Sequence, residues 1–331
     1  MERPYPFAAV TPATQPFEMP SVGFVGAGKG GQTLAAAMAT IGVRVTAVAS
    51  RSRASAERLA ELAGVPSSGV RDRAAEVPAL AQIVLLTVPD DAIGGAVTEI
   101  CRAKAWHPGH AVVHCSGALP SSLLDCARAE GSPAGSFHPL QAFAQRPPDA
   151  ATASAQLEGI VFGIEGDALL RPALERFAVL LGGRPLWLLP ETKPLYHAAA
   201  VIASNYLVTL VGTSAELLAG CGLDADQSVS ALLPLLHGTM ANLAALGVPG
   251  ALTGPLSRGD TGTIARHLAH LDGASPEAAA LYRCLGLATV PFALAKDPAA
   301  GEQIEEAASL LRSAPLSQAT EAAQQPPHRL P

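Results

Sequence analysis

The sequence predicts an α/β protein, in which an N-terminal Rossmann dinucleotide-binding domain with a mostly parallel sheet is followed by an all-α C-terminal domain. Three observations predict this class. Short apolar segments alternate with helical patterns up to Pro190, a glycine-rich turn follows the first segment, and strand signals stop after Pro190. Strands that are apolar throughout and are separated by helices are typical of a parallel sheet covered on both faces.

The predicted elements follow in order along the chain. The expected strands span residues 21–26, 43–50, 81–90, 110–117, 135–143, 157–166 and 183–190. The helices between them are an alanine-rich segment ending at Ile41 and residues 54–64, 91–103, 119–131 and 167–182. The second half adds helices over 195–220, 223–247, 275–294 and 297–314.

The domain boundaries follow from these elements. We expect a Rossmann domain over residues 21–190 and a helical domain over 191–312. Residues 1–20 and 313–331 are rich in proline and polar residues, so they are expected to be disordered tails. In the helical domain, Asp224 and Gln227 have the spacing of a capping box, and Pro234 is expected to kink the helix that they begin.

Composition excludes some classes of function. The formal net charge of −6 and the pI near 5.8 indicate no basic surface for nucleic acid or for anionic membranes. The five cysteines are odd in number and form no CxxC pair, which favours reduced thiols in a cytoplasm. Residues 195–220 are long enough to test as a membrane span, but His197, Ser204 and Asn205 lie within them, so we expect a buried core helix.

The turn after the first strand carries Gly26, Gly28 and Gly31 in a GxGxxG pattern. A strand precedes this pattern and a helix follows it, which is the context of a dinucleotide site. The first glycine allows the tight turn, the second lets the backbone approach a pyrophosphate, and the third lets helix and strand pack closely. A tight turn without a ligand is the alternative. The predicted cofactor-binding residues of the loop are Gly26, Ala27, Gly28, Lys29, Gly30 and Gly31.

The end of the second predicted strand favours NADP over NAD. An NAD site places an acidic residue about 20 residues after the glycines, where it binds the ribose 2′-hydroxyl. Here no acid occurs before Glu57, and Ser50, Arg51, Ser52 and Arg53 occupy the region. Two hydroxyls and two guanidiniums suit a 2′-phosphate, whereas a solvated polar loop would leave the choice of cofactor open.

Further candidates lie at the ends of later strands, where ligands bind in such folds. Val88 and Pro89 are expected to line the adenosine or the nicotinamide ribose of the cofactor. His114 and His138 are suited to hold a carboxylate or to donate a proton, and each fits a structural histidine equally well. Cys115 lacks a helix or a cation that would activate it, so we expect it to be structural.

The helical half contributes a second set of candidates. His197 and Ser204 are seven residues apart, which places them on nearly one helix face, with Asn205 beside them. Thr253 and Arg258 lie in a glycine- and proline-rich loop, where Arg258 is either a carboxylate clamp or part of a surface ion pair. The histidines show no HxH or HxxxH spacing, so no metal site is predicted.

Six segments together resemble a known group of proteins. They are VGFVGAGKGG, TVPDDAI, HCSGAL, FHPLQAF, YHAAAVIASNYLV and ALTGPLSRGD. They resemble the Rossmann-like NADP-dependent oxidoreductases that carry a C-terminal helical domain of unknown function, over roughly residues 20–300. That group is similar to the 6-phosphogluconate-dehydrogenase-like superfamily, which includes pyrroline-5-carboxylate reductases, ketopantoate reductases and β-hydroxyacid dehydrogenases.

The resemblance implies hydride transfer between NADP(H) and a small carboxylate-bearing C=O or C=N substrate. Ser116 and Gly117 fall where β-hydroxyacid dehydrogenases hold a carboxylate. The catalytic lysine of some relatives has no counterpart between His197 and Ala295. His197 is therefore the expected proton donor, with Asn205 as its neighbour and Ser204 as a substrate contact.

Other interpretations stay open at this point. His138 is the rival of His197 as the proton donor. A ketopantoate-type or prephenate-type dehydrogenase and an NADP-binding sensor without turnover are alternative functions, and a deazaflavin coenzyme occurs in the superfamily. We expect a cytoplasmic homodimer formed through the helical domain.

Overall fold

The computed structural model describes residues 19–313, which form two compact units divided between Tyr206 and Leu207. The tails predicted at 1–20 and 313–331 lie outside the described residues except at Met19, Pro20 and Ser313, and Met19 packs against the core of the sheet. The first unit includes α7, which the sequence analysis assigns to the helical domain.

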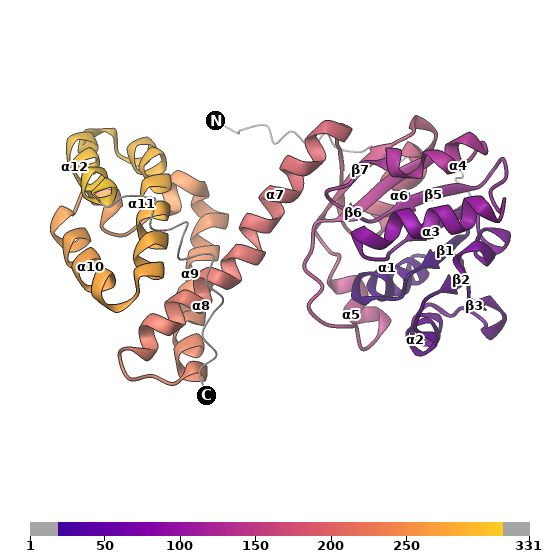
Figure 1. The fold of residues 1–331 in the computed structure, drawn as a ribbon, viewed down its shortest axis with the longest axis horizontal. Coiled ribbons are helices and arrows are strands. Elements are labelled where there is room, and N and C mark those ends of the chain that lie inside the picture. The colour runs from indigo at the N-terminus through magenta and orange to yellow at the C-terminus, as the bar shows by residue number, and fades with distance from the viewer. Residues whose placement is uncertain (1–18, 314–331) are drawn as a thin grey trace. The chain divides into compact units, whose positions relative to one another are not determined.

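The first unit is built on one eight-stranded sheet with the order β3-β2-β1-β4-β5-β6-β7-β8 (Figure 1). All neighbouring strands are parallel except β6 and β7. The predicted fold class is confirmed, and the short edge strand β3 adds to the predicted set. The strands are β1 Val22–Val25, β2 Val45–Ala49, β3 Val70–Arg71, β4 Ile83–Leu86, β5 Ala111–His114, β6 Ala134–Pro139, β7 Val161–Gly166 and β8 Arg184–Trp187.

Helices cover both faces of this sheet, which explains why its central strands are apolar throughout. One core contains side chains of α1, α2, α5 and α6, with Phe137 and Phe162 stacked between them. The core on the other face contains side chains of α3 and α4. The helices of this unit are α1 Lys29–Thr40, α2 Arg53–Ala63, α3 Asp90–Arg102, α4 Asp125–Ala129, α5 Ala150–Ala155, α6 Arg171–Leu180 and α7 Lys193–Ala203.

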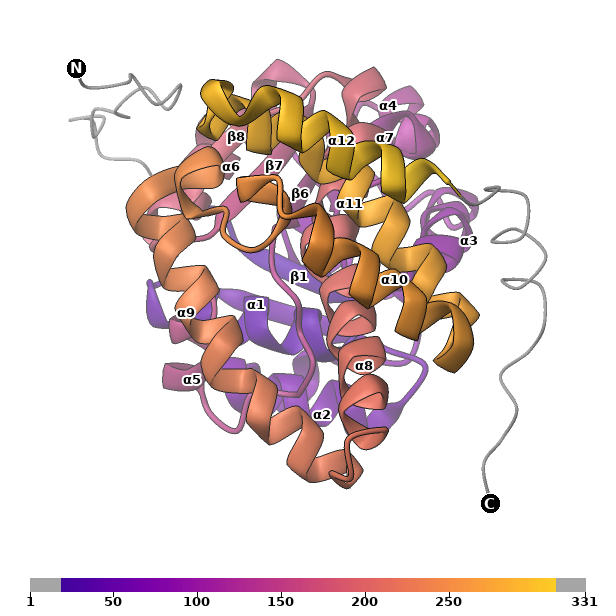
Figure 2. The ribbon, with the colours of Figure 1, turned by 90° about the vertical axis from the view of Figure 1, so that its left-hand side faces the viewer.

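The second unit is helical, as predicted. Its core is formed by α10, α11 and α12, with Ile264, Leu268 and Ile304 among the buried side chains, and Figure 2 shows α8 and α9 diverging from a short connection. The capping box of α9 is confirmed, because Asp224 and Gln227 each accept the other's backbone N–H. The helices are α8 Asn205–Ala219, α9 Ala225–Ala251, α10 Thr261–Ala274, α11 Pro276–Lys296 and α12 Gly301–Arg312.

Two features of α7–α9 differ from the sequence expectations. The backbone of α9 leaves the helical region at Gly247 (φ 69°), where the predicted helix ends, and the helix resumes to Ala251. The prediction of a buried core helix over 195–220 is wrong for the single chain, since the apolar window within residues 190–219 has no buried residue. Leu195 is 76% exposed and Leu235 is 67% exposed. Helices in residues 190–219, 225–251 and 276–296 are long and apolar enough to cross a membrane by length and composition.

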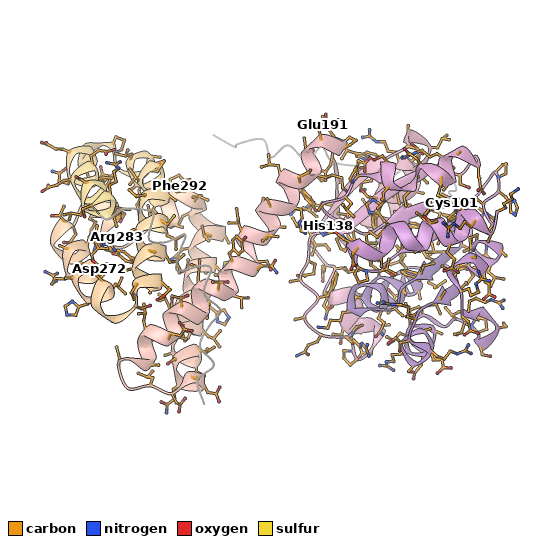
Figure 3. The ribbon with its side chains drawn as sticks, viewed as in Figure 1. Cys101, His138, Glu191, Asp272, Arg283 and Phe292 are labelled. Carbon is orange, nitrogen blue, oxygen red and sulfur yellow. A yellow bond between two sulfur atoms is a disulfide. The ribbon has the colours of Figure 1, made fainter. Side chains whose placement is uncertain are left out.

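The prediction of reduced thiols is also wrong for one pair of cysteines. Cys101 of α3 and Cys126 of α4 form a disulfide with their Cα atoms 6.3 Å apart (Figure 3, where Cys101 is labelled). The two residues are 25 positions apart in sequence and form no CxxC motif. They meet because α3 and α4 pack on the same face of the sheet, which spacing alone does not reveal.

Candidate functional site

The glycine loop between β1 and α1 has a different constraint at each glycine of the motif. Gly26 has φ +106°, and a Cβ on it would lie 2.7 Å from the backbone of Thr87. A Cβ on Gly31 would lie 2.7 Å from the Thr87 hydroxyl and 2.8 Å from the Gly26 carbonyl. Gly28 has no atom within 4 Å of its Cβ position, so its backbone is open to a ligand. This arrangement matches the three roles that a dinucleotide-binding loop requires.

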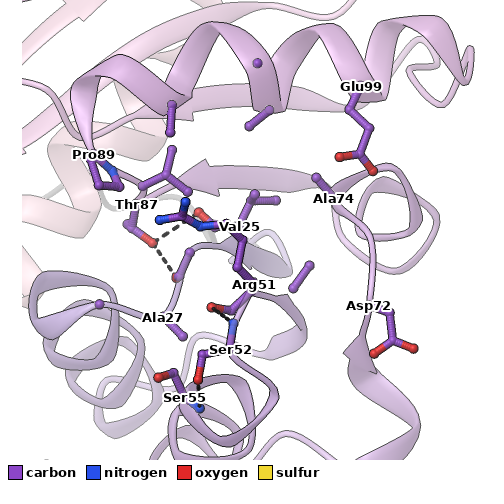
Figure 4. Close-up of a pocket in the computed structure, with 18 of the residues that line it drawn as sticks. Val25, Ala27, Arg51, Ser52, Ser55, Asp72, Ala74, Thr87, Pro89 and Glu99 are labelled. Atoms are coloured by element: carbon purple, nitrogen blue, oxygen red, sulfur yellow. Dashed lines mark hydrogen bonds between the residues drawn. The ribbon is translucent and has the colours of Figure 1, made fainter.

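This loop forms part of the wall of a cleft of about 810 Å³ at the carboxyl edge of the sheet (Figure 4). The predicted cofactor residues that line the cleft are Gly26, Ala27, Gly28, Ser50, Arg51, Ser52, Val88 and Pro89. Lys29, Gly30 and Gly31 lie in the first turn of α1, and the Cβ position of Gly30 is 3.3 Å from the ring of Phe143. The cleft offers backbone amides, hydroxyls and guanidinium groups, which suit a phosphorylated ligand. The carboxylates of Asp72 and Glu99 also line it.

The end of the cleft beside α2 carries hydroxyl and guanidinium groups. Ser52 caps α2 and accepts the Ser55 amide at 3.3 Å, and both residues line the cleft. Arg146 also lines it and donates to the Ser55 hydroxyl at 3.3 Å. The second guanidinium of the expected pair is absent here, because Arg53 forms ion pairs with Glu57 and Asp72. Arg146 comes from the loop after β6 and provides a second guanidinium besides Arg51.

A second group of polar side chains surrounds Gly117, at the end of β5. The Nδ1 atom of His138 lies 3.0 Å from the Tyr196 hydroxyl, and the rings of His138 and His197 are 6.1 Å apart in an edge arrangement. A Cβ on Gly117 would lie 2.9 Å from Nε2 of His138 and 2.8 Å from Cδ2 of His197. Gly117 is therefore the point at which the two predicted catalytic histidines meet.

The backbone amide of Gly117 is a second feature of this point. Gly117 is buried, and its N–H has no hydrogen-bond partner within residues 19–313. A buried amide without a partner costs free energy comparable to a lost hydrogen bond, so such groups mark places where a ligand can bind.

Lys193 is a buried cation behind this group. Its side chain is fully buried, and Nζ donates to the Ser116 carbonyl at 3.1 Å and to the Ser136 hydroxyl at 2.6 Å. Burial lowers the pKa of Lys193 to about 8, against the attraction of the Glu165 and Asp90 carboxylates. The amine is therefore mostly charged at neutral pH. Its charge favours a negative group near the Ser116–Gly117 turn.

The neighbouring titratable groups respond to the same burial. The pKa of His138 is lowered to about 4 by burial and by the nearby His197 and Lys193. The pKa of His114 is lowered to about 4 by burial, with Lys193 again contributing. Burial raises the pKa of Cys115 to about 12, so this thiol stays protonated and unreactive. At neutral pH, His114 and His138 are neutral imidazoles.

The side chain of Ser116 is already engaged within the protein. Its hydroxyl donates to Asp90 at 2.7 Å and accepts the amides of Ala118 and Leu119. Asp90 follows Pro89 directly, so this bond joins the Ser116–Gly117 turn to the cleft wall. A ligand at this turn is therefore expected to meet Gly117 before it meets the Ser116 hydroxyl.

The remaining predicted residues lie elsewhere in the two units. Ser204 follows the last residue of α7, and Asn205 begins α8. The predicted single helix is therefore interrupted at Ser204, the residue expected to share a face with His197. Thr253 and Arg258 lie in the second unit and are exposed. Arg258 forms no ion pair with any residue of the described part. Within residues 19–313, no group of three or more His, Cys, Asp or Glu side chains is placed to hold a metal ion.

Three residues near the site were missed by the sequence analysis. Arg146 lies in a loop that no motif marks, and Tyr196 has no motif of its own beyond the segment that it shares with His197. Lys193 begins α7 and so precedes the segment from His197 to Ala295, which contains no lysine. Helical spacing pointed to it, because Lys193, Tyr196 and His197 are at positions i, i+3 and i+4 and so share one face of α7.

Comparison with known proteins agrees with this architecture. Residues 10–139 match the family of Rossmann-like domains, and residues 160–289 match a domain of unknown function, DUF2520. The chain is thus a Rossmann-like protein that carries this C-terminal domain, which confirms the resemblance of its motifs. A comparison with curated proteins finds no match.

Solved structures include several similar chains. A candidate NADP oxidoreductase of Bacteroides fragilis is 26% identical, with a TM-score of 0.63 over 81% of this chain and 96% of that one. A Thermotoga maritima protein is 24% identical, with a TM-score of 0.60 over 88% and 99%. An imine reductase from Pseudomonas sp. is 20% identical, with a TM-score of 0.52 over 92% and 95%. The fold is that of dinucleotide-dependent oxidoreductases.

Proposed function

We propose that this protein is an NADP-dependent oxidoreductase that transfers hydride to or from a small carboxylate-bearing C=O or C=N substrate. One observation carries the proposal. The dinucleotide cleft and Gly117, the residue against which His138 and His197 lie, are at the ends of neighbouring strands, since β4 and β5 pair directly and the Ser116–Asp90 bond joins the two places. The substrate group at Gly117 would therefore lie beside the cofactor cleft.

The preference for NADP rests on the α2 end of the cleft. NADP(H), when bound, supplies or accepts the hydride. The Gly28 backbone would approach its pyrophosphate, and Arg51, Arg146 and the hydroxyls of Ser52 and Ser55 would hold the 2′-phosphate. A charge-assisted contact of this kind increases the affinity for the cofactor about tenfold, which corresponds to about 1.4 kcal/mol. We expect NADPH to bind at least about tenfold more tightly than NADH in a calorimetric titration; equal affinities would contradict the proposal.

The substrate class follows from the groups around Gly117. The unpartnered amide of Gly117 and the Nε2 atom of His138 are placed to meet a carboxylate or a developing oxyanion. Lys193 contributes a positive charge from behind without reaching the ligand. Arg258 and Thr253 remain proposals for a further carboxylate contact from the second unit.

His197 is the proposed proton donor. His138 is neutral at working pH, because its pKa is about 4, so it is suited to hold the substrate through a hydrogen bond rather than to deliver a proton. His197 belongs to the same group, since its Cδ2 atom is 2.8 Å from the same Cβ position of Gly117. A positioned acid or base of this kind contributes about 10²–10⁴-fold to a rate.

The test uses turnover under saturating NADPH with a panel of small keto acids, imines and hydroxy acids. His197→Ala should lower kcat by about 100-fold or more at unchanged NADPH affinity, whereas His138→Ala should raise KM as well. If His197→Ala keeps a normal kcat and His138→Ala loses it, His138 is the proton donor instead. NADPH binding without turnover of any substrate would instead indicate a sensor.

We further infer that a second copy of the chain covers the exposed apolar helices, giving a cytoplasmic homodimer. Val208 and Leu235 are 73% and 67% exposed in the single chain, which is costly in water. Leu235→Glu should shift the protein from dimer to monomer in light scattering, whereas Leu169→Glu, at an 82% exposed position of the first unit, should leave the dimer intact. A monomeric wild-type protein, or one recovered only with membranes, would contradict this inference.

A further inference from the structure

The hydroxyl of Tyr196 is held between β7 and His138. A Cβ on Gly163, in β7, would lie 2.7 Å from this hydroxyl oxygen, so only glycine leaves room for it. The hydroxyl is 3.0 Å from Nδ1 of His138, and the two rings meet edge to face with centroids 5.6 Å apart. Two positions without a side chain, Gly163 and Gly117, thus enclose the pair from opposite sides of His138.

The hydrogen-bond direction follows from the partners of each atom. Burial raises the pKa of Tyr196 to about 12, and a backbone hydrogen bond from Gly163 opposes the rise. Tyr196 therefore keeps its proton at neutral pH, so its hydroxyl has a hydrogen to donate. Within residues 19–313, Nδ1 of His138 is the side-chain acceptor that this hydroxyl meets. The tyrosine donates, and the histidine nitrogen accepts.

The hydrogen bond from Tyr196 determines the tautomer of His138. A neutral imidazole carries one proton, and which nitrogen holds it is determined by the hydrogen bond made by the other. With Nδ1 accepting from Tyr196, the proton resides on Nε2. That atom is 2.9 Å from the Cβ position of Gly117, which is also 2.8 Å from Cδ2 of His197. His138 thus presents an N–H donor at the place where the unpartnered Gly117 amide lies.

We propose that Tyr196 is a positioning residue, which fixes His138 as the Nε2–H tautomer and so makes it a hydrogen-bond donor to the substrate oxygen or nitrogen at Gly117. The substrate side of this proposal rests on the proposed function. The tautomer itself does not, because it is a property of the protein without substrate.

The first experiment is long-range ¹H–¹⁵N NMR of the full-length protein with labelled histidine, at pH 7. The His138 signals are assigned by their loss in His138→Gln. We expect the Nε2–H pattern in the wild type and a mixture of tautomers in Tyr196→Phe. A Nδ1–H pattern in the wild type, or an unchanged pattern in Tyr196→Phe, would overturn the proposal.

A matched control exists in the second unit. Tyr282 and His267 form a pair with a hydroxyl-to-Nδ1 distance of 2.9 Å and rings 5.7 Å apart. Tyr282→Phe should change the signals of His267 and leave those of His138 unchanged. If Tyr196→Phe does not fold, Gly163→Ala tests the same contact by displacing the hydroxyl, and it should change the His138 pattern in the same direction.

The second experiment separates this proposal from the proposed function. Tyr196→Phe should keep the wild-type affinity for NADPH, and with a substrate in hand it should raise KM about tenfold while kcat falls less. If NADPH does not bind the wild type at all, the proposed function fails and the tautomer result still stands. If NADPH binds and KM is unchanged in Tyr196→Phe, the role of His138 toward the substrate is wrong.

Discussion

The two tyrosine–histidine pairs of this chain have nearly the same internal geometry and very different surroundings. His138 with Tyr196 and His267 with Tyr282 have hydroxyl-to-Nδ1 distances of 3.0 and 2.9 Å and interplanar angles of 87° and 85°. The first pair lies against two glycines and near a buried lysine, whereas His267 is exposed on the surface of α10. A tyrosine–histidine hydrogen bond alone therefore does not define a candidate functional site. The two pairs differ in the open space at the glycines and in the charge of the nearby lysine.

The largest expected effect comes from filling that space. Gly117→Ala would place a methyl group within 2.9 Å of both His138 and His197, so the two rings must separate. We expect kcat to fall by 100-fold or more, on the order of 2.7 kcal/mol, with NADPH affinity unchanged. The matched variant is Gly273→Ala in α10, where nothing lies within 4 Å; it should raise stability by about 0.5–1 kcal/mol. Normal turnover in Gly117→Ala would show that the rings have another arrangement.

The comparison also shows what the sequence reveals and what it does not. The strands of the first unit were predictable because both faces are buried, and the glycine loop was predictable because a tight turn and a close helix contact demand glycine at Gly26 and Gly31. The contact of Tyr196 with His138 joins residues 58 positions apart, and no local pattern encodes such a distance.

Some wrong expectations have the same cause. The apolar periodicity in residues 195–220 predicts a helix with an apolar face. It does not predict whether this face packs against the same chain, against a second copy or against another partner. The burial of Lys193 depends on two acceptors far from it in sequence, the Ser116 carbonyl in the turn after β5 and the Ser136 hydroxyl in β6. The Cys101–Cys126 disulfide depends on the packing of two helices. Each of these features is a tertiary contact, and the residue types alone fit several outcomes.

The next largest expected effect is a loss of stability at low pH, which arises from the buried histidines of the first unit. The pKa values of His114 and His138 are about 4 in the folded chain, against about 6.5 for an ordinary histidine. Between pH 4 and pH 6.5 these two histidines bind more protons in the unfolded chain than in the folded chain. Their lowered pKa values therefore contribute to the free energy of unfolding fully above pH 6.5, and this contribution is lost as the pH falls toward 4. We expect a loss of roughly 2 kcal/mol per histidine between pH 7 and pH 5.

Urea denaturation at the two pH values measures this loss. His138→Gln should remove about half of the loss assigned to the two histidines. If the wild type and His138→Gln lose the same free energy of unfolding between pH 7 and pH 5, the pKa of His138 is not lowered in the folded chain.

A smaller effect concerns the guanidinium groups. Arg146→Ala should weaken NADPH binding by about fivefold to tenfold, near 1–1.4 kcal/mol, and leave NADH binding unchanged, because Arg146 lines the cleft and donates to Ser55 of α2, beside the proposed 2′-phosphate position. Arg51→Ala should have a similar effect. Arg266→Ala, in the second unit, is the control and should change neither affinity. Parallel losses for both cofactors would indicate that Arg146 supports the fold of its loop rather than the 2′-phosphate.

The smallest effect is expected at the second pair. Tyr282→Phe removes a hydroxyl from a hydrogen bond to an exposed histidine, and water can replace the lost partner, so the free energy of unfolding should fall by no more than about 1 kcal/mol. Tyr196→Phe leaves Nδ1 of the more buried His138 without a donor, and such a loss costs about 1–3 kcal/mol. Thermal and urea unfolding of the two variants, measured side by side, compare one substitution in two environments. Equal losses would mean that both pairs are equally solvated, and the distinction drawn between them would then be wrong.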